Sequence, residues 1–153
     1  MPSLHQVRQM PWSAEQMFDL VADVARYGEF LPWVVATRVR SDSETEMIAD
    51  MLVGFSAIRE KFTSRVEKRR AEDIRVHYVD GPLKDLDNVW TFRALGPQQC
   101  EIDFKVEFSF RNLLFEKLAS QYFDKAFRKM VTAFEKRARE LYGSSSSSAT
   151  NAA

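Results

Sequence analysis

Two polar side chains in predicted strands are candidates for chemistry because they share a face with apolar neighbours. Glu60 falls in phase with Phe62, and Tyr78 falls in phase with Ile74 on a second strand. A carboxylate and a phenol that share an interior are suited to act as general acid and general base. A sheet arginine, a water molecule or a bound ligand would equally satisfy Glu60, because burial of a bare carboxylate is very costly.

The remaining reactive residues give little support to an enzyme. His77 lies on the polar side of its strand, and neither His77 nor His5 has a patterned carboxylate or serine partner. Cys100 falls among apolar positions, where a thiol behaves as a small hydrophobe. One cysteine excludes an internal disulfide, and with two histidines it gives no zinc-like ligand set. We therefore expect no catalytic residue, no metal site and no resident cofactor.

Alternation of apolar and polar residues predicts the elements that position these side chains. It is clearest from Cys100 to Phe110, where six apolar residues oppose polar ones. A strand with one apolar and one polar face is typical of an antiparallel sheet with one side in water. Turn residues such as Gly54 and Gly81 separate several strands. Seven strands are predicted, at about 3–10, 33–41, 45–53, 58–66, 74–78, 86–95 and 99–110.

Two helices are predicted, one near each end of the chain. Ser13 and Gln16 form a capping box, so the first helix begins at Ser13. Its apolar residues keep helical spacing through Val24 until Tyr27 and Gly28 end the run. The second helix covers about 112–142, and its apolar stripe contains Leu114, Leu118, Tyr122, Phe127, Met130, Phe134 and Leu141.

The length of the second helix decides the fold class. At 1.5 Å per residue it would run roughly 45 Å, whereas a folded chain of this size has a diameter of about 35 to 40 Å. The helix must therefore cross the whole globule, and a twisted sheet can cover it by curling around it. We predict an α+β fold in which a seven-stranded antiparallel sheet grips the C-terminal helix. One domain is expected over 1–143, followed by a disordered tail over 144–153.

Composition and charge exclude several classes of protein. The chain has 153 residues, of which 45% are hydrophobic, and no apolar run approaches the roughly 20 residues that cross a bilayer. Its start lacks the features of a signal or transit peptide, so a cytoplasmic location is expected. The segment 112–142 carries seven basic and four acidic residues, a net charge of +3. This excess gives only a weak attraction for anionic lipid or RNA and is more typical of a solvated helix face, and no DNA partner is expected.

Large side chains are predicted on the facing sides of the sheet and the C-terminal helix. They either complete a solid core or line a cavity beside the helix. On the sheet they are Phe62, Tyr78, Trp90, Phe92, Phe104, Phe108 and Phe110, and on the helix they are Leu118, Tyr122, Phe123 and Met130.

The chain resembles the coenzyme Q-binding proteins of the START-like, or helix-grip, superfamily in three stretches, which read VADVARYGEFLPW, GPLKDLDNVWTF and MVTAFEKRARELYG. The resemblance covers about residues 3–143. Family members often have a cysteine directly after FLPW, and this chain has Val34 there. The resemblance implies seven antiparallel strands around an apolar tunnel, with the FLPW segment at the tunnel mouth.

The resemblance also implies a function. It is non-catalytic binding of ubiquinone or a similar polyprenyl lipid, in support of respiratory electron transport or quinone biosynthesis. The expected partners are this ligand and, transiently, the inner-membrane surface, and no oligomeric state is implied. The ligand-binding residues would be Phe30, Leu31, Trp33, Glu60, Phe62, Tyr78, Leu83, Trp90, Phe92, Phe104, Phe108, Leu118, Tyr122 and Phe123.

Two alternatives stay open on the same resemblance. The family includes bacterial ribosome-association toxins, so the chain could instead bind the large ribosomal subunit. Some START-like relatives cyclise or dehydrate polyketides, and in such an enzyme Glu60 and Tyr78 would be the acid and the base.

Overall fold

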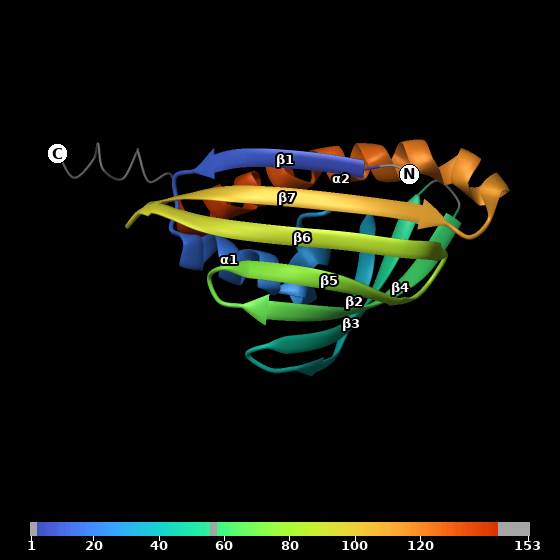
Figure 1. Cartoon of the computed structure of the whole chain (residues 1–153), viewed down its shortest axis with the longest axis horizontal. Helices are drawn as coiled ribbons and strands as arrows, with labels where there is room; N and C mark the ends of the chain where they lie inside the picture. Colours follow the sequence, from blue (N-terminus) through green and yellow to red (C-terminus); the bar gives the residue numbers. More distant parts are fainter. Residues whose placement is uncertain (1–2, 56–57, 144–153) are drawn as a thin grey trace.

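The computed structural model describes residues 3–55 and 58–143, with only the backbone of Phe55, Ile58, Phe115 and Leu118. The predicted tail, 144–153, lies outside the described residues. In chain order the elements are β1 (Ser3–Met10), α1 (Ala14–Ala22), the 3-10 helix η1 (Val24–Glu29), β2 (Val34–Asp42), β3 (Glu46–Phe55), β4 (Ile58–Arg69), β5 (Asp73–Asp80), β6 (Leu83–Gly96), β7 (Gln99–Phe110) and α2 (Leu113–Tyr142) (Figure 1).

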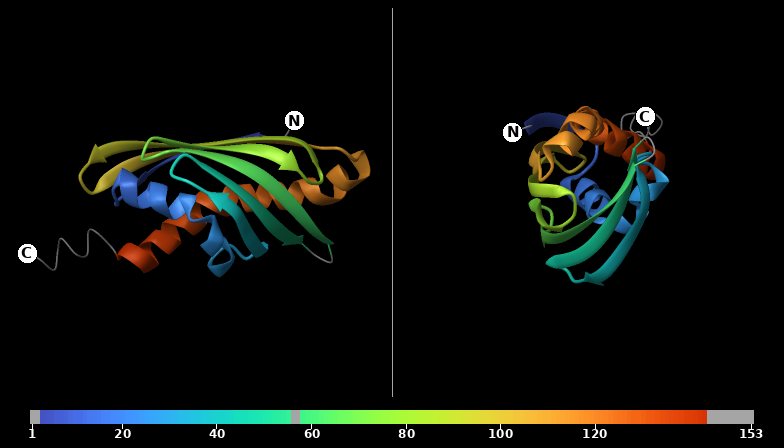
Figure 2. Two further views of the ribbon diagram at one scale, coloured as in Figure 1. Left: turned by 90° about the horizontal axis from the view of Figure 1, so that it is seen from below. Right: turned by 90° about the vertical axis from the view of Figure 1, so that its right-hand side faces the viewer.

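The strands form one seven-stranded antiparallel sheet in the order β1-β7-β6-β5-β4-β3-β2. From β2 to β7, strands that follow one another in the chain are neighbours in the sheet, and β1 and β2 form its opposite edges. Figure 2 shows the sheet curling around α2, with α1 and η1 on the same concave side. The predicted α+β fold, a sheet that grips the C-terminal helix, is confirmed.

The start of α1 follows the predicted capping box. The Gln16 backbone N–H donates to Ser13 Oγ over 3.1 Å, and the Ser13 backbone N–H donates to Gln16 Oε1 over 3.0 Å. These two bonds satisfy donors that a helix start leaves unpaired. Trp12 and Met17, which flank this start, are both buried in the core.

The first helix is shorter than predicted, because it ends at Ala22 and a 3-10 helix follows. A 3-10 helix has three residues per turn, so residues three apart share a face. Val24, Tyr27 and Phe30 have this spacing and turn toward the interior, whereas Ala25 is exposed. The prediction of one continuous helix from Ser13 to Tyr27 was therefore wrong, and the tighter turn of η1 directs Tyr27 inward.

The inward face of the sheet follows the predicted alternation. In β7 the six apolar residues from Cys100 to Phe110 are all at most 4% exposed. Of the several register shifts in the sheet, one occurs where Thr63 pairs with Asp80 and Ser64 pairs with Tyr78, which leaves Val79 as an extra, exposed residue in β5. Such a bulge increases the local twist, as a curled sheet requires.

The apolar side of α2 differs from prediction at its ends. Its buried residues include three alanines, which allow the helix to lie close to neighbouring elements. Among the described side chains of α2, the buried ones are Ala119, Phe123, Ala126, Val131, Phe134 and Ala138. Leu114 and Leu141, predicted on the apolar stripe, are 67% and 51% exposed because they lie in the first and last turns. Within the described part of the chain, no helix is both long and apolar enough to cross a membrane.

Candidate ligand-binding cavity

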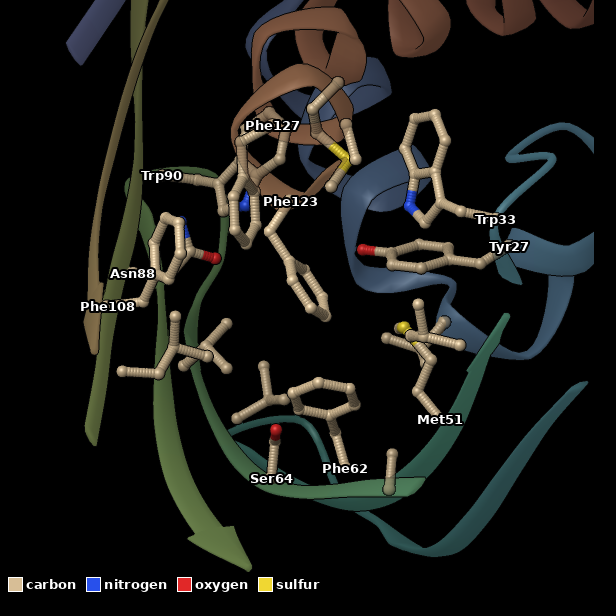
Figure 3. A pocket seen from close by; sticks show the side chains of 18 of the residues that line it. Tyr27, Trp33, Met51, Phe62, Ser64, Asn88, Trp90, Phe108, Phe123 and Phe127 are labelled. Carbon is tan, nitrogen blue, oxygen red and sulfur yellow. The ribbon is translucent and has the colours of Figure 1, made fainter. Parts of the chain in front are cut away.

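A cavity of about 150 Å³ lies between the concave face of the sheet and α2 (Figure 3). Five strands, α2 and the α1–η1 segment all contribute side chains to it. An apolar cavity of this volume is large enough for a benzene-sized group, as an engineered cavity in another protein shows. The lining residues are Val21, Val24, Tyr27, Trp33, Ala49, Met51, Val53, Phe62, Ser64, Val66, Ile74, Val76, Leu83, Leu86, Asn88, Trp90, Phe108, Tyr122, Phe123, Ala126, Phe127, Met130 and Phe134.

Aromatic contacts hold the walls of the cavity together. Trp90 on β6 meets Phe134 on α2 with ring centroids 5.1 Å apart, and Phe108 on β7 meets Phe127 at 5.2 Å. On the other side Phe62 of β4 meets Phe123 at 5.8 Å in an edge-to-face arrangement. Such pairs add to the burial of the rings, so the cavity is bounded by well-packed walls on both sides of α2.

Seven of the predicted ligand-binding residues line this cavity. They come from the segment before β2, from the three strands β4, β6 and β7, and from α2. The position of α2 relative to the strands could not be predicted from sequence alone. The seven are Trp33, Phe62, Leu83, Trp90, Phe108, Tyr122 and Phe123. The side chain of Leu118 is outside the described part of the structure.

Four further predicted residues are buried or half-buried behind the lining. Phe104 packs against Trp90 with ring centroids 4.5 Å apart, and Phe92 packs against Phe18 of α1 with centroids 5.5 Å apart. Phe30 contacts Phe134 at 5.1 Å, and Leu31 is 1% exposed in the core. These residues support the cavity walls without lining the cavity, and a tunnel mouth at FLPW stays a prediction.

Glu60 and Tyr78, the proposed acid and base, also lie outside the cavity lining. The Tyr78 hydroxyl accepts a 2.8 Å hydrogen bond from the Leu83 backbone N–H and so closes the turn between β5 and β6. Burial raises the pKa of Tyr78, although the Leu83 bond acts in the opposite direction. No ion pair involves Glu60 within residues 3–55 and 58–143, so the sheet arginine that we considered as its partner is not found.

The polar side chains that do line the cavity include two that the sequence analysis did not select. Ser64 and Asn88 both point into it (Figure 3). Asn88 lies in phase with Leu86 and Trp90 on β6, so the signal that drew attention to Glu60, a polar residue in an apolar phase, was present for Asn88 too. Tyr27 was missed because η1 was taken for part of an ordinary helix.

Electrically, the cavity is neutral. Among the described residues that line it, none is Asp, Glu, Lys, Arg or His. The Tyr27 hydroxyl donates to the Val21 carbonyl oxygen, and burial raises the pKa of Tyr27, with the Asp23 carboxylate adding to the effect. A neutral, apolar lining favours an uncharged ligand, because a charged one would lose its hydration without compensation.

The other reactive residues lie away from the cavity. Cys100 is fully buried in β7, and this burial raises the pKa of its thiol to about 11. His77 lies 2.8 Å from the Glu67 carboxylate, between the strands β4 and β5. In the described ranges, no group of three or more His, Cys, Asp or Glu residues is placed to hold a metal ion.

An antiparallel sheet that grips a long helix around an apolar cavity defines the START-like class of proteins. Comparison with known sequences gives the family: the chain belongs to the polyketide cyclase / dehydrase and lipid transport family, whose sequence profile matches residues 10–135.

Named relatives carry two different descriptions. The chain is 37% identical to the ribosome association toxin RatA of Pseudomonas aeruginosa over 134 residues, which cover 88% of this chain and 93% of RatA. It is 38% identical to the mitochondrial coenzyme Q-binding protein COQ10 homolog B of Xenopus laevis over 136 residues, covering 86% of this chain and 56% of that protein.

Solved structures share the fold. An 18 kDa protein of Caulobacter crescentus superimposes with a TM-score of 0.72 at 34% identity, covering 94% of this chain and 99% of that one. The Zhui aromatase/cyclase of Streptomyces superimposes with a TM-score of 0.80 over 92% of this chain and 95% of its own. Its identity is only 13%, so this second likeness concerns the fold alone.

Proposed function

We propose that this protein binds a polyprenyl quinone, or a lipid of the same kind, in the cavity between the sheet and α2. The observation that carries the proposal is the neutral, aromatic-lined cavity of about 150 Å³. Its volume suits one ring, so the head group would occupy it and most of the tail would extend beyond it. The name of the Xenopus relative, a coenzyme Q-binding protein, supports this ligand class.

The tail would supply much of the affinity. Each methylene that leaves water contributes about 0.8 kcal/mol, so a few isoprene units give micromolar binding after the costs of ordering the ligand. Because its tail needs an apolar environment, the ligand would move between the protein and a membrane surface. This movement would support respiratory electron transport or quinone biosynthesis.

The proposed role is binding without catalysis. The acid and base that an enzyme would use, Glu60 and Tyr78, do not line the cavity, and the Tyr78 hydroxyl already accepts from the Leu83 backbone. Burial raises the pKa of Tyr78, which makes it a poorer acid near neutral pH. We expect a bound ligand to be recovered chemically unchanged.

Filling the cavity tests the proposal. Ala126 lines it and is 8% exposed, so Ala126→Phe would place a ring in the space for the ligand. Gln121→Phe adds the same ring at an exposed position of the same helix. A quinone with a multi-unit tail should quench tryptophan fluorescence in wild type and in Gln121→Phe, and at least tenfold more ligand should be needed for Ala126→Phe. Equal affinity in all three proteins would contradict the proposal.

Ribosome association is the second candidate, favoured by the RatA relatives and by a row of lysines on α2. Lys125, Lys129 and Lys136 are exposed, and none is in an ion pair within the described residues. Such a row could contact RNA phosphates. Arg137, on the same helix, pairs with Glu29 and is only 16% exposed at its side chain, so it is left out of this row.

Charge reversal separates the two candidates. If RNA is the partner, a Lys125→Glu, Lys129→Glu, Lys136→Glu variant should lose co-sedimentation with ribosomal subunits while it keeps ligand binding, and wild-type association should weaken steeply with salt. If the cavity carries the function, wild type should not co-sediment at physiological salt, and the variant should bind quinone as wild type does.

A further inference from the structure

Asn88 places one polar group in the apolar wall of the cavity. It is 9% exposed on β6, and its Nδ2 donates a 2.8 Å hydrogen bond to the carbonyl oxygen of Lys105 on β7. A carbonyl oxygen only accepts hydrogen bonds, so the amide nitrogen must face β7. The amide oxygen, Oδ1, is therefore turned the other way, into the cavity (Figure 3).

Asn88 Oδ1 has no donor among the described residues, although it lies in apolar surroundings. A buried acceptor without a donor is costly. Water can supply the donor while no ligand is bound. A ring that fills a cavity of about 150 Å³ displaces this water, and the ligand must then donate in its place.

The other polar groups in the lining have different needs. The Ser64 hydroxyl can donate or accept, and the indole N–H groups of Trp33 and Trp90 can only donate. The hydroxyls of Tyr27 and Tyr122 each already make a hydrogen bond to a backbone carbonyl. Asn88 Oδ1 differs from these groups because it can only accept. When a ligand fills the cavity, this oxygen therefore depends on a donor from the ligand.

The two redox states of a quinone differ in this respect. The oxidised ring carries carbonyl oxygens, which only accept hydrogen bonds. Reduction adds two electrons and two protons and converts both carbonyls to hydroxyls, which also donate. We propose that Asn88 makes the cavity prefer the reduced, quinol form of the ligand over the oxidised quinone. This inference rests on the proposed function, because it names the form of the ligand that the same cavity binds.

The preference has a measurable size. One neutral buried hydrogen bond that only the quinol makes is expected to tighten its binding about tenfold. For a two-electron couple, a tenfold ratio of dissociation constants raises the midpoint potential of the bound ligand by about 30 mV. The protein would hold its ligand as quinol without supplying any electron itself.

Direct comparison of the two forms tests the inference on the wild-type protein. A ubiquinone with a short tail and its quinol, kept reduced without oxygen, are titrated separately and followed by tryptophan fluorescence. The quinol should bind about tenfold more tightly. The 1,4-dimethyl ether of the quinol cannot donate, so it should bind as weakly as the quinone.

Two variants locate the effect at Asn88. Asn88→Leu removes the acceptor, so the ratio of the two dissociation constants should fall to about one, since the quinol loses its single extra hydrogen bond. Ser64→Ala is the matched control in the same lining. It should weaken the binding of quinone and quinol alike, because the Ser64 hydroxyl can donate a hydrogen bond to either form. Thermal unfolding identifies variants that do not fold, and the ether comparison needs no variant.

The outcomes separate the inference from the proposed function. Equal binding of quinone and quinol by wild type, or tighter binding of the quinone or the ether, would overturn the preference and leave the binding role intact. Binding of neither form would overturn both.

Discussion

The Tyr122 hydroxyl on α2 donates a 2.9 Å hydrogen bond to the carbonyl oxygen of Gly54 near the end of β3. This bond links the helix to a strand on the side of the sheet far from β7. The Gly54 backbone N–H in turn donates to the Trp33 carbonyl oxygen over 2.9 Å, so helix, β3 and the segment before β2 are joined at one place. Since Tyr122 and Trp33 both line the cavity, this link bounds the space that a ligand must enter.

Removal of this link should speed ligand exchange. Tyr122→Phe loses the hydrogen bond to Gly54, and we expect a loss of about 1 kcal/mol in the free energy of unfolding together with faster ligand release in stopped-flow fluorescence. Tyr142→Phe is the control, because its hydroxyl donates to the Gln16 carbonyl oxygen over 3.1 Å at the other end of α2. Equal release rates in the two variants would show that the Tyr122 link does not control exchange.

The Asp50 carboxylate gives a pH-dependent contribution to stability. Thr63 Oγ1 donates to it over 2.7 Å, and Arg40 Nε donates to its other oxygen over 2.7 Å. The Thr63 bond, followed by the Arg40 interactions, lowers the pKa of Asp50 below its ordinary value of 3.8, although burial acts in the opposite direction. A group whose pKa is lower in the folded state stabilises the fold above its ordinary pKa and loses that contribution as the pH falls through its folded pKa.

Thr63→Val should therefore destabilise the protein most near neutral pH. We expect a loss of about 1 to 3 kcal/mol at pH 7 by urea denaturation, because a hydrogen bond to a charged group disappears. The difference from wild type should shrink as the pH falls below the ordinary aspartate pKa of about 4 and on through the lower folded pKa of Asp50. Thr91→Val, at an exposed position of β6, is the control and should change stability little at either pH.

Gly81 is required by the turn between β5 and β6. Its φ is +149°, and an added Cβ would lie 2.8 Å from the Tyr78 hydroxyl and 3.0 Å from the Lys61 carbonyl oxygen. Gly81→Ala should lower the free energy of unfolding by about 1 to 3 kcal/mol, measured by denaturant titration. Gly96→Ala serves as the control, since a Cβ there meets nothing within 4 Å. Similar losses in the two variants would show that the backbone at Gly81 is not restrictive.

Glu60→Gln should be almost silent. Glu60 lies outside the cavity lining and has no ion pair in the described part of the chain, so we expect a change within about 0.5 kcal/mol in stability and unchanged ligand affinity. Phe62→Leu, two residues along β4 and in the lining, should weaken ligand binding. Affinity is measured by fluorescence titration. A large loss of ligand affinity in Glu60→Gln would show that the Glu60 carboxylate belongs to the binding site.

Most of the fold could be predicted from local patterns. Alternation identified the strands because one face of the sheet is buried and the other is wet, as in β7. The break between α1 and η1 could not be predicted this way. Residues three apart, such as Val24 and Tyr27, fit a period of 3.0 and a period of 3.6 almost equally over so short a run.

The site was less predictable than the fold. Alternation shows that Trp90 and Phe104 face inward, and their rings lie 4.5 Å apart. Whether an inward ring lines the cavity or supports it from behind depends on the position of α2. That position is determined by packing between residues far apart in sequence. Trp90 therefore borders the cavity while Phe104 does not.

The pairing of β1 with β7 has a consequence for how the chain folds. Ser3 pairs with Glu107 and Met10 with Cys100, so the first strand of the chain needs a partner about a hundred residues later. At about 5 to 20 residues per second of synthesis, β1 would wait roughly 5 to 20 s for that partner. Contacts so distant in sequence also slow folding in general. The sheet can grow in order from β2 to β7, and β1 then joins it last.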